Sequence, residues 1–324
     1  MQIVVLDGYT LNPGDLNWDR LKAIGETKIY DRTGKQDIVS RSYGAEILLT
    51  NKTPISEEII EALPNLRFIG VLATGYNVVD TEAAAERGIP VCNIPTYGTP
   101  SVAQMVFAHI LNFCQHVQNH SDSVKEGKWT ASPDFCFWDY PMQELADKNL
   151  GIIGFGRIGQ KTADLGEAFG MNILGYDTCK SDQSKRTNFK WVELDELLSQ
   201  SDFISLHCPL FEETKGLIHA ENLKKMKNSA FLINTSRGPL IVEEDLAEAL
   251  EQGIIAGAGL DVLCSEPPLE ANPSPLLSEE NCVITPHISW ATKAARTRLM
   301  NMAVDNIIAF LNGNIQNDVT KKNR

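Results

Sequence analysis

The sequence segment that decides the fold is Leu150-Gly151-Ile152-Ile153-Gly154-Phe155-Gly156-Arg157-Ile158-Gly159. A short apolar run typical of a buried strand leads into the spacing G-x-G-x-x-G at Gly154, Gly156 and Gly159. In such a turn the first glycine permits a tight bend, the second lets a ligand approach the backbone, and the third lets helix and strand lie close together. The exposed N–H groups at the start of the helix then bind pyrophosphate. The segment predicts a dinucleotide-binding strand–turn–helix unit.

An acidic residue follows at the distance that a dinucleotide site requires. The next apolar run, at 172–176, leads to Asp177, about 20 residues beyond the glycine turn. A carboxylate there binds the hydroxyls of the adenosine ribose and repels a 2′-phosphate, which predicts NAD rather than NADP. Lys180 adds one cation nearby, so some use of NADP stays open, as does the simpler interpretation of Asp177 as a solvated turn residue.

Short apolar runs alternate with polar helical stretches along the rest of the chain. In the first hundred residues we expect strands at 3–6, 47–50, 68–72 and 91–94, with helices at 15–24, 56–63 and 80–87. From residue 149 on we expect six strands, at 150–154, 172–177, 202–206, 230–234, 256–261 and 282–285. Strands that alternate with helices form parallel sheets covered on both faces. The pattern predicts an α/β fold with a doubly wound nucleotide-binding sheet in the second series.

Two long helices flank the second series of strands. The first begins at Thr99-Pro100, a capping residue followed by proline, and is expected to run to about Asn119. It is apolar on most faces, which suits a helix buried between domains or in a subunit interface. The last helix, at 291–311, has no strand after it, so we expect it to cross back to the first domain.

The composition is that of a soluble globular protein and disfavours several partners. A chain of 324 residues suggests two domains, and the formal net charge of -13 disfavours nucleic acid and anionic membranes. The N-terminus lacks a cationic leader, and no apolar run reaches the roughly 20 residues of a membrane span. Seven scattered cysteines without a C-x-x-C pair indicate a reducing compartment, so we expect a cytoplasmic protein.

Three charged or titratable side chains follow neighbouring predicted strands. Arg237 comes shortly after the strand at 230–234, Glu266 follows the next strand, and His287 follows the last one. Open α/β sheets bind their ligands at this carboxyl edge. Together these are the groups that reduction of a 2-oxo acid needs.

The chemistry of that reduction assigns a role to each group. When hydride reaches a carbonyl carbon, the oxygen must receive a proton, and His287 can supply it near neutral pH. Glu266, if paired with His287, would favour the imidazolium and fix the orientation of the ring. Arg237 can bind the substrate carboxylate with its planar fork and polarise the carbonyl. Each could instead be an ordinary turn, loop or surface residue, but their joint position favours an active site.

The remaining histidines indicate no second site. His109, His116 and His120 are expected on the one long helix, and the spacing of the last two could hold a metal. Without an H-E-x-x-H pattern, buried or interfacial histidines are the better interpretation, and we expect no metal. His207 is expected on the adenine side of the cofactor, and His219 on a helix surface.

At these residues the chain resembles the D-isomer-specific 2-hydroxyacid dehydrogenases. The resemblance covers nearly the whole length, from 72–77 to 287–290. Its most specific stretches are 150–159, 206–210 with 214–218, 234–239, 259–262 with Glu266-Pro267, and Thr285-Pro286-His287. In that family the residues matching Arg237, Glu266 and His287 form the active site, so the resemblance implies the same roles as the chemistry does.

The resemblance also implies a cofactor, a substrate site and a domain order. NAD is the implied cofactor, and backbone N–H groups of Ala73, Thr74 and Gly75 are implied to bind the substrate carboxylate. The residues implied to line the cofactor site are Thr74, Gly154, Gly156, Arg157, Ile158, Gly159, Asp177, Cys208, Pro209, Thr214, Thr235, Ser236, Asp261 and Trp290. Two Rossmann-like doubly wound domains are implied: a discontinuous, flavodoxin-like substrate-binding domain at 1–98 and 291–324, and an NAD-binding domain at 99–290 inserted into it.

Within the family, the stretches 73–77, 97–99, 135–139 and 287–290 are most similar to glycerate dehydrogenases, also called hydroxypyruvate reductases. The expected reaction interconverts D-glycerate and hydroxypyruvate, with glyoxylate as a further substrate. The apolar helix that begins at Thr99 and the apolar loop at 134–140 predict a homodimer through the NAD domain, with both segments at the interface. In this dimer Trp138 either closes the neighbouring subunit's substrate pocket or acts only as an interface anchor. Activity on another 2-oxo acid, an NADH-sensing binding protein and a hydrolase that retains NAD stay open as alternatives.

Overall fold

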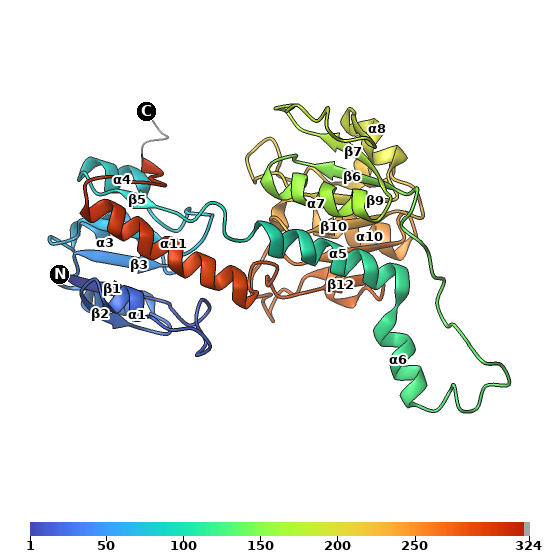
Figure 1. Cartoon of the computed structure of the whole chain (residues 1–324), viewed down its shortest axis with the longest axis horizontal. Helices are drawn as coiled ribbons and strands as arrows, with labels where there is room; N and C mark the ends of the chain where they lie inside the picture. The colour runs from blue at the N-terminus through green and yellow to red at the C-terminus, as the bar shows by residue number, and fades with distance from the viewer. Residues whose placement is uncertain (321–324) are drawn as a thin grey trace. The chain divides into compact units, whose positions relative to one another are not determined.

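The computed structural model describes residues 1–320 and divides the chain into two compact units. The first unit comprises Met1–Gly98 and the C-terminal segment from Trp290, and the second comprises Thr99–Ser289. Each unit is built on one sheet of parallel strands with helices along it (Figure 1). The predicted α/β class with doubly wound parallel sheets is confirmed.

The first sheet has the strand order β2-β1-β3-β4-β5, the flavodoxin-like arrangement. Its strands are β1 (Gln2–Val5), β2 (Glu26–Ile29), β3 (Ile47–Thr50), β4 (Phe68–Val71) and β5 (Val91–Cys92). The helices of this unit are α1 (Asp19–Lys22), α2 (Ile38–Ser42), α3 (Glu57–Glu61), α4 (Thr81–Glu86), α11 (Lys293–Leu311) and the 3-10 turn η1 (Lys35–Asp37). β3 and β4 are buried along their whole length, and α11 adds Leu299, Val304 and Ile307 to the same core.

The second sheet has the order β12-β11-β10-β9-β6-β7-β8, the Rossmann order extended by one strand. Its strands are β6 (Asn149–Ile153), β7 (Asn172–Tyr176), β8 (Phe189–Trp191), β9 (Phe203–Leu206), β10 (Phe231–Asn234), β11 (Gly257–Leu260) and β12 (Cys282–Ile284). Its helices are α5 (Thr99–Gln115), α6 (Val117–Lys125), α7 (Arg157–Ala168), α8 (Leu194–Gln200), α9 (Ala220–Leu223), α10 (Glu243–Glu251) and the 3-10 turns η2 (Gly238–Leu240) and η3 (Pro275–Ser278). The order reverses between β6 and β9, which is where such sheets bind ligands.

Two edge strands, β2 and β8, were not among the predicted strands. β2 alternates exposed and half-buried residues, and β8 is three residues long with an exposed lysine in its centre. An edge strand has a neighbour on one side only, and proteins commonly keep such strands short and polar. Neither segment therefore has the apolar run by which the central strands were found.

The single long helix predicted at 99–119 is wrong at its C-terminal end. α5 ends at Gln115, and His116 adopts a left-handed backbone with a φ of 46° before α6 begins. The His116 ring stacks on Tyr140 with the ring centroids 4.6 Å apart, a contact between distant segments that helical periodicity does not encode. The three histidines of this stretch therefore do not share one helix.

Two smaller expectations about helices also change. The helix at 15–24 shrinks to α1, because Asn12 Oδ1 accepts hydrogen bonds from the N–H groups of Gly14 and Leu16 and holds the preceding residues in a turn. His219 is the N-cap residue of α9 with an extended backbone, not part of a helix surface.

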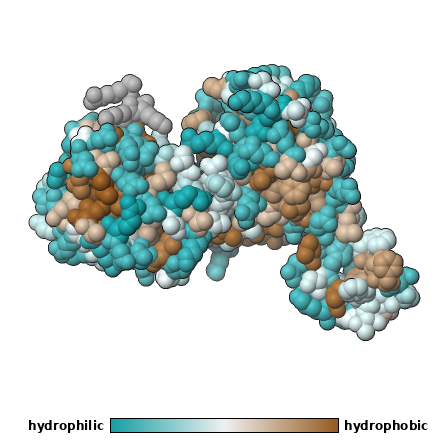
Figure 2. Space-filling view, in the orientation of Figure 1, coloured by the Kyte–Doolittle hydropathy of each residue, from teal (hydrophilic) through white to brown (hydrophobic). Residues whose placement is uncertain are grey.

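An extended arm, defined here as residues 117–142, leaves the body of the second unit. It consists of α6 and the irregular segment after it (Figure 1). Most of its large apolar side chains are exposed, among them Val117, Trp129, Phe135, Trp138 and Met142. Figure 2 shows apolar surface over this part of the molecule. Within residues 1–320 no helix is both long and apolar enough to cross a membrane.

Candidate active site

The three glycines of the turn between β6 and α7 have two different roles: two allow close backbone contacts, and one leaves space for a ligand. Gly154 has a φ of 92°, and a Cβ there would lie 2.4 Å from the Cys208 backbone nitrogen. A Cβ on Gly159 would lie 2.3 Å from the Gly154 carbonyl oxygen. Gly156, the N-cap residue of α7, has no atom within 4 Å of its Cβ position. Two glycines therefore let the chain lie against itself, and the third leaves the helix N-terminus open to a ligand.

Asp177 follows β7 directly and is fixed by two backbone groups. Its Oδ2 accepts a hydrogen bond from the Phe155 N–H at 2.6 Å, and its Oδ1 accepts one from the Cys179 N–H at 2.8 Å. A carboxylate has about four acceptor positions, so each oxygen keeps capacity for a further donor. The carboxylate is thus tied to the glycine turn while able to accept the hydroxyls of a ribose.

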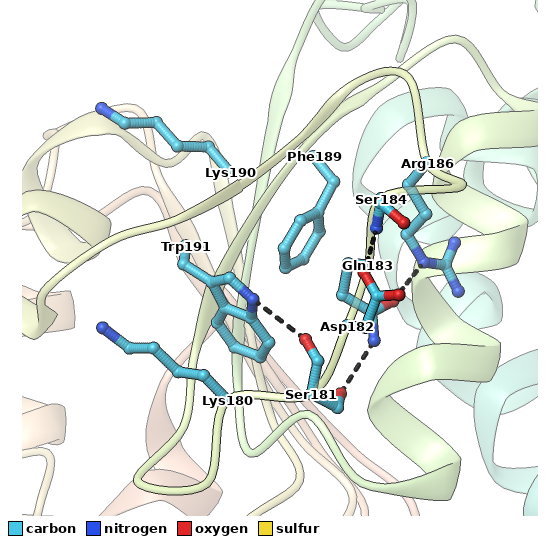
Figure 3. Close-up of a pocket in the computed structure, with 9 residues that line it drawn as sticks. All are labelled: Lys180, Ser181, Asp182, Gln183, Ser184, Arg186, Phe189, Lys190 and Trp191. Carbon is cyan, nitrogen blue, oxygen red and sulfur yellow. Dashed lines mark hydrogen bonds between the residues drawn. The ribbon is translucent and has the colours of Figure 1, made fainter.

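Three of the cations that follow Asp177 are engaged with carboxylates. They line a cavity of about 610 Å³ between the loop after Asp177 and β8 (Figure 3). Lys180 pairs with Glu193 at 3.2 Å, and Lys190 lies 2.5 Å from Glu196. Arg186 bonds two carboxylates of α7, each at 2.6 Å. In each pair a carboxylate offsets the positive charge of its partner.

Two buried hydroxyl groups at the same edge of the second sheet have no hydrogen-bond partner within the described residues. Thr235 directly follows β10 and is 9% exposed, and its hydroxyl has no hydrogen bond within the described chain. Ser289 is buried too, and its hydroxyl is likewise without a partner in residues 1–320. A buried polar group without a hydrogen bond costs free energy unless a ligand or water provides one. The two hydroxyls fit a site that is completed by a polar ligand such as a nicotinamide dinucleotide.

The other residues expected around the cofactor lie near the same edge of the second sheet. Arg157 and Ile158 open α7, and Ser236 donates its hydroxyl to the Leu206 carbonyl at 2.7 Å. Pro209 follows β9, and its carbonyl accepts the Thr214 hydroxyl at 2.7 Å.

His207 and Cys208, which follow β9, are not charged. Burial lowers the pKa of His207 to about 3, and its Nε2 lies 2.9 Å from the Ser205 hydroxyl. Burial raises the pKa of the Cys208 thiol to about 11. The two side chains therefore present a neutral surface beside the glycine turn.

The Asp261 carboxylate accepts hydrogen bonds from the segment at 285–289 of the chain itself. It follows β11 and is 1% exposed. Its Oδ1 accepts hydrogen bonds from the Thr285 hydroxyl at 2.5 Å and the Ile288 N–H at 2.9 Å, and its Oδ2 accepts one from the Ser289 N–H at 2.7 Å. Its carbonyl also accepts the His287 N–H at 2.8 Å. One buried carboxylate therefore fixes the segment that carries His287, whose φ of 55° is left-handed.

His109 supports this network from α5, a role that sequence reasoning missed. Its Nε2 lies 3.4 Å from the Thr285 hydroxyl, and its ring lies over the backbone of β11, where a Cβ on Gly259 would be 2.9 Å away. Burial lowers the pKa of His109, which keeps the ring neutral, although the Asp261 charge acts in the opposite direction. Gly259, inside the strand β11, was an available signal of a close approach.

Glu266 and His287 are in direct contact. Glu266 Oε2 lies 2.7 Å from His287 Nδ1, and Glu266 Oε1 accepts the Leu263 N–H at 3.2 Å. Both side chains remain about one third exposed, at 35% and 30%. Because a carboxylate only accepts, Nδ1 carries the proton of this bond, and Nε2 is the nitrogen free to exchange a proton with a ligand.

Arg237 lies on the neighbouring loop, which packs against the loop of Glu266. A Cβ on Gly238 would be 2.1 Å from the Leu263 carbonyl oxygen, so the two backbones touch. The Asn234 side chain shapes the turn by donating to the Arg237 carbonyl at 2.8 Å. The exposed guanidinium donates to the Ser236 carbonyl at 2.7 Å and keeps further N–H groups for an anion.

Five expected site residues lie in the first unit or on the arm. The loop of Ala73, Thr74 and Gly75 follows β4, and the Thr74 hydroxyl donates to the Ile94 carbonyl at 2.8 Å. In the described chain the N–H groups of Thr74 and Gly75 have no partner. Trp290 packs edge-on against Tyr97, and Trp138 on the arm is 65% exposed.

Comparisons with known proteins agree with this arrangement. A model of the family described as "D-isomer specific 2-hydroxyacid dehydrogenase, NAD binding domain" matches residues 107–289. The chain is 56% identical over 324 residues to the hydroxypyruvate reductase of Blautia hydrogenotrophica, covering 99% of this chain and 100% of the relative. It is 42% identical to the glycerate dehydrogenase of Methylorubrum extorquens, covering 91% of this chain and 92% of the relative.

The chain belongs to the D-isomer-specific 2-hydroxyacid dehydrogenase family. Among solved structures, the D-lactate dehydrogenase of Aquifex aeolicus complexed with NAD and lactic acid has a TM-score of 0.81 at 30% identity, covering 97% of this chain and 96% of that one. The predicted family, the NAD cofactor and the class of NAD-dependent D-2-hydroxyacid dehydrogenase are therefore confirmed. In this dehydrogenase, the open glycine turn and the tethered Asp177 suit that cofactor.

Proposed function

We propose that this dehydrogenase reduces hydroxypyruvate to D-glycerate with NADH and accepts glyoxylate as a second substrate. The observation that carries the chemistry is the 2.7 Å contact between Glu266 Oε2 and His287 Nδ1 at the carboxyl edge of the second sheet. The substrate follows from the relatives, because a protein 56% identical over the whole chain is named hydroxypyruvate reductase. We assign cofactor binding to the second unit, which also supplies Arg237, Glu266 and His287, and we assign the substrate-binding loop at 73–75 to the first unit.

In the proposed mechanism His287 is the acid and base. NADH supplies the hydride that the 2-oxo carbon receives. The carbonyl oxygen then takes the proton from His287 Nε2, while Nδ1–H stays bonded to Glu266. The carboxylate stabilises the imidazolium before the transfer and fixes the ring so that Nε2 faces outward. In the oxidation direction the same nitrogen accepts the hydroxyl proton.

Arg237 and the loop at 73–75 are proposed to hold the substrate. Arg237 binds the carboxylate and polarises the 2-oxo group, since a guanidinium offers parallel N–H groups to a planar anion. The N–H groups of Thr74 and Gly75 donate to the substrate carboxylate. Both groups act by charge and hydrogen bonding alone, so they set affinity and orientation and leave proton transfer to His287.

A steady-state screen tests the function. NADH oxidation is measured with hydroxypyruvate, glyoxylate, pyruvate and 2-oxoisocaproate, and we expect the highest kcat/KM for hydroxypyruvate. A higher value for 2-oxoisocaproate or pyruvate would assign the enzyme to another 2-oxo acid. Binding of NADH without oxidation by any of the four acids would favour an NADH-sensing protein instead.

We propose further that the enzyme is a homodimer formed through the second unit and its arm. The support is the exposed apolar surface of the arm, where Phe135 is 88% and Trp138 is 65% exposed (Figure 2). Such surface on a soluble protein commonly marks an interface. Light scattering at micromolar concentration should give twice the chain mass of 35.8 kDa, and a value of one chain mass would refute the dimer.

Trp138 is proposed to limit the substrate pocket of the neighbouring subunit. Trp138→Ala should then remain dimeric, admit bulkier 2-oxo acids and raise KM for hydroxypyruvate. A dimeric variant with unchanged selectivity would reduce Trp138 to an interface anchor. We place the enzyme in the cytoplasm, which suits a chain with seven scattered cysteines and no C-x-x-C pair.

A further inference from the structure

Glu243 is a buried carboxylate that the proposed proton transfer does not use. It is the first residue of α10 and is 9% exposed. Its Oε1 accepts a hydrogen bond from the Cys264 N–H at 2.6 Å, and its Oε2 accepts one from the Ser274 hydroxyl at 2.5 Å. Hydrogen bonds to a carboxylate at such distances are among the stronger ones in proteins.

Cys264 and Ser274 are the two ends of the loop that carries Glu266. Between them every side chain is exposed or half-buried, and Leu269 is 58% exposed. The nearest buried apolar residues along the chain lie just outside the loop, at Leu263 before it and Leu276 after it. Within the described chain this loop therefore has no core of its own, and Glu243 joins its two ends.

The peptide that Glu243 binds also supports the active site. The Leu263 N–H donates to Glu266 Oε1, and the Cys264 N–H, on the next residue, donates to Glu243. Gly238, which follows Arg237, packs on the same peptide, because a Cβ there would lie 2.4 Å from the Cys264 nitrogen. A displacement of the Leu263–Cys264 peptide would therefore also move the adjoining Leu263 N–H, which binds Glu266.

We propose that Glu243 is a positioning residue that acts through Glu266 on His287 and so sets the pH range of the reaction. The inference rests on the proposed roles of Glu266 and His287. A carboxylate in contact with an imidazole favours its protonated form, and the effect falls steeply when the two separate. Loss of Glu243 lets the loop move, which weakens the contact between Glu266 and His287 and with it the electrostatic support that the carboxylate gives to the imidazolium.

The other titratable groups around Glu243 are thiols and acids. Burial, with a contribution from Glu243, raises the pKa of Cys264 and of Cys282 to about 12, so both thiols stay neutral during an assay. Glu244 and Glu279 add to these shifts as negative charges. Within this cluster Glu243 is the carboxylate whose hydrogen bonds reach both ends of the loop.

A graded set of variants tests the proposal, measured as kcat/KM for hydroxypyruvate against pH. Glu243→Ala should lower kcat/KM about tenfold and move its alkaline limb down by about one pH unit. Ser274→Ala should cause a smaller change in the same direction. Glu243→Gln should retain most activity, because its amide can accept from Cys264 and donate to Ser274. Glu244→Gln, an exposed neighbour with the same loss of charge, is the matched control and should match the parent enzyme.

A double variant separates positioning from simple stability. If Glu243 acts through Glu266, adding Glu243→Ala to Glu266→Gln should change kcat/KM by less than twofold, since coupled residues are not additive. Losses that multiply, with an unmoved alkaline limb in Glu243→Ala, would overturn the proposal. If Glu243→Ala does not fold, the position of the alkaline limb in the kcat/KM profile of Ser274→Ala, compared with that of the parent enzyme, serves as the test instead. Failure of the proposed function is visible separately, as a parent enzyme that reduces none of the acids.

Discussion

Each of the two sheets has an aspartate just past a strand end that accepts backbone N–H groups, and the two aspartates differ in what they leave free. In the first unit Asp7 follows β1 and accepts three N–H groups, from Asn51 at 2.7 Å, Lys52 at 2.6 Å and Thr53 at 2.7 Å. In the second unit Asp177 accepts two, one on each oxygen.

The difference shows that position at a strand end does not by itself make a ligand site. Asp7 ties β1 to the turn after β3, its neighbour in the sheet, and most of its acceptor capacity is used. Asp177 is fixed to the glycine turn yet keeps acceptor capacity. The same contrast extends along both edges, because the first sheet offers N–H groups at 73–75 and the second offers ionisable side chains.

The largest expected effect is at the ionisable edge of the second sheet. His287→Gln removes the proton donor and should lower kcat for hydroxypyruvate by about 10²–10⁴. The affinity for NADH, measured by fluorescence titration, should stay within a few-fold of that of the parent enzyme. His219→Gln, which changes the histidine at the N-terminus of α9, serves as the control. A loss in kcat below tenfold would exclude His287 as the acid.

A smaller loss of activity is expected when a planar guanidinium is replaced by an ammonium group of the same charge. Arg237→Lys should raise KM for hydroxypyruvate by roughly tenfold to a hundredfold, because an ammonium cannot bind a carboxylate with two parallel N–H groups. Arg20→Lys, in an exposed ion pair of the first unit, should leave KM unchanged. An unaltered KM in Arg237→Lys would mean that the N–H groups of the first sheet suffice to bind the substrate.

Cofactor choice tests Asp177 directly. Asp177→Ala should narrow the preference for NADH over NADPH by about tenfold or more, since it removes both the ribose acceptor and the repulsion of a 2′-phosphate. The measurement is the ratio of kcat/KM for the two reduced cofactors. A parent enzyme that prefers NADPH, or a ratio insensitive to this change, would show that Asp177 is as purely structural as Asp7.

The smallest expected effect is at Asp7 itself. Asp7→Asn replaces one acceptor oxygen by a donor that faces backbone N–H groups, which should lower the free energy of unfolding by about 1–3 kcal/mol. Urea unfolding measures this loss, and the cofactor ratio should not change. A shifted cofactor ratio in Asp7→Asn would contradict the division between the two aspartates.

Features that depend on residues close together in the sequence could be predicted from it. The apolar run and glycine turn at 150–159 and the strand β3 were predicted with correct or nearly correct boundaries. The contact between Glu266 and His287 was considered as a condition of the chemistry, and the structure contains it. Each follows from local spacing or from the fact that parallel strands end at one edge of a sheet.

Features that depend on a returning segment of chain could not be predicted. The break at His116 depends on Tyr140, and the engagement of Asp261 depends on how the segment at 285–289 folds back. In the sequence Glu243 is one of three consecutive acids at the start of α10, where acids are common for electrostatic reasons. Its two hydrogen bonds become visible only once both ends of the loop at 264–274 are placed.

The discontinuous first unit has a consequence for synthesis on the ribosome. Its sheet is complete by Gly98, but the helix α11 that supplies Leu299, Val304 and Ile307 to its core is made last. At about 5–20 residues per second, roughly 10–40 s pass between those two events. During that time the second unit can finish folding while one face of the first sheet still lacks its cover, so the nascent chain is most exposed to aggregation at its N-terminal end.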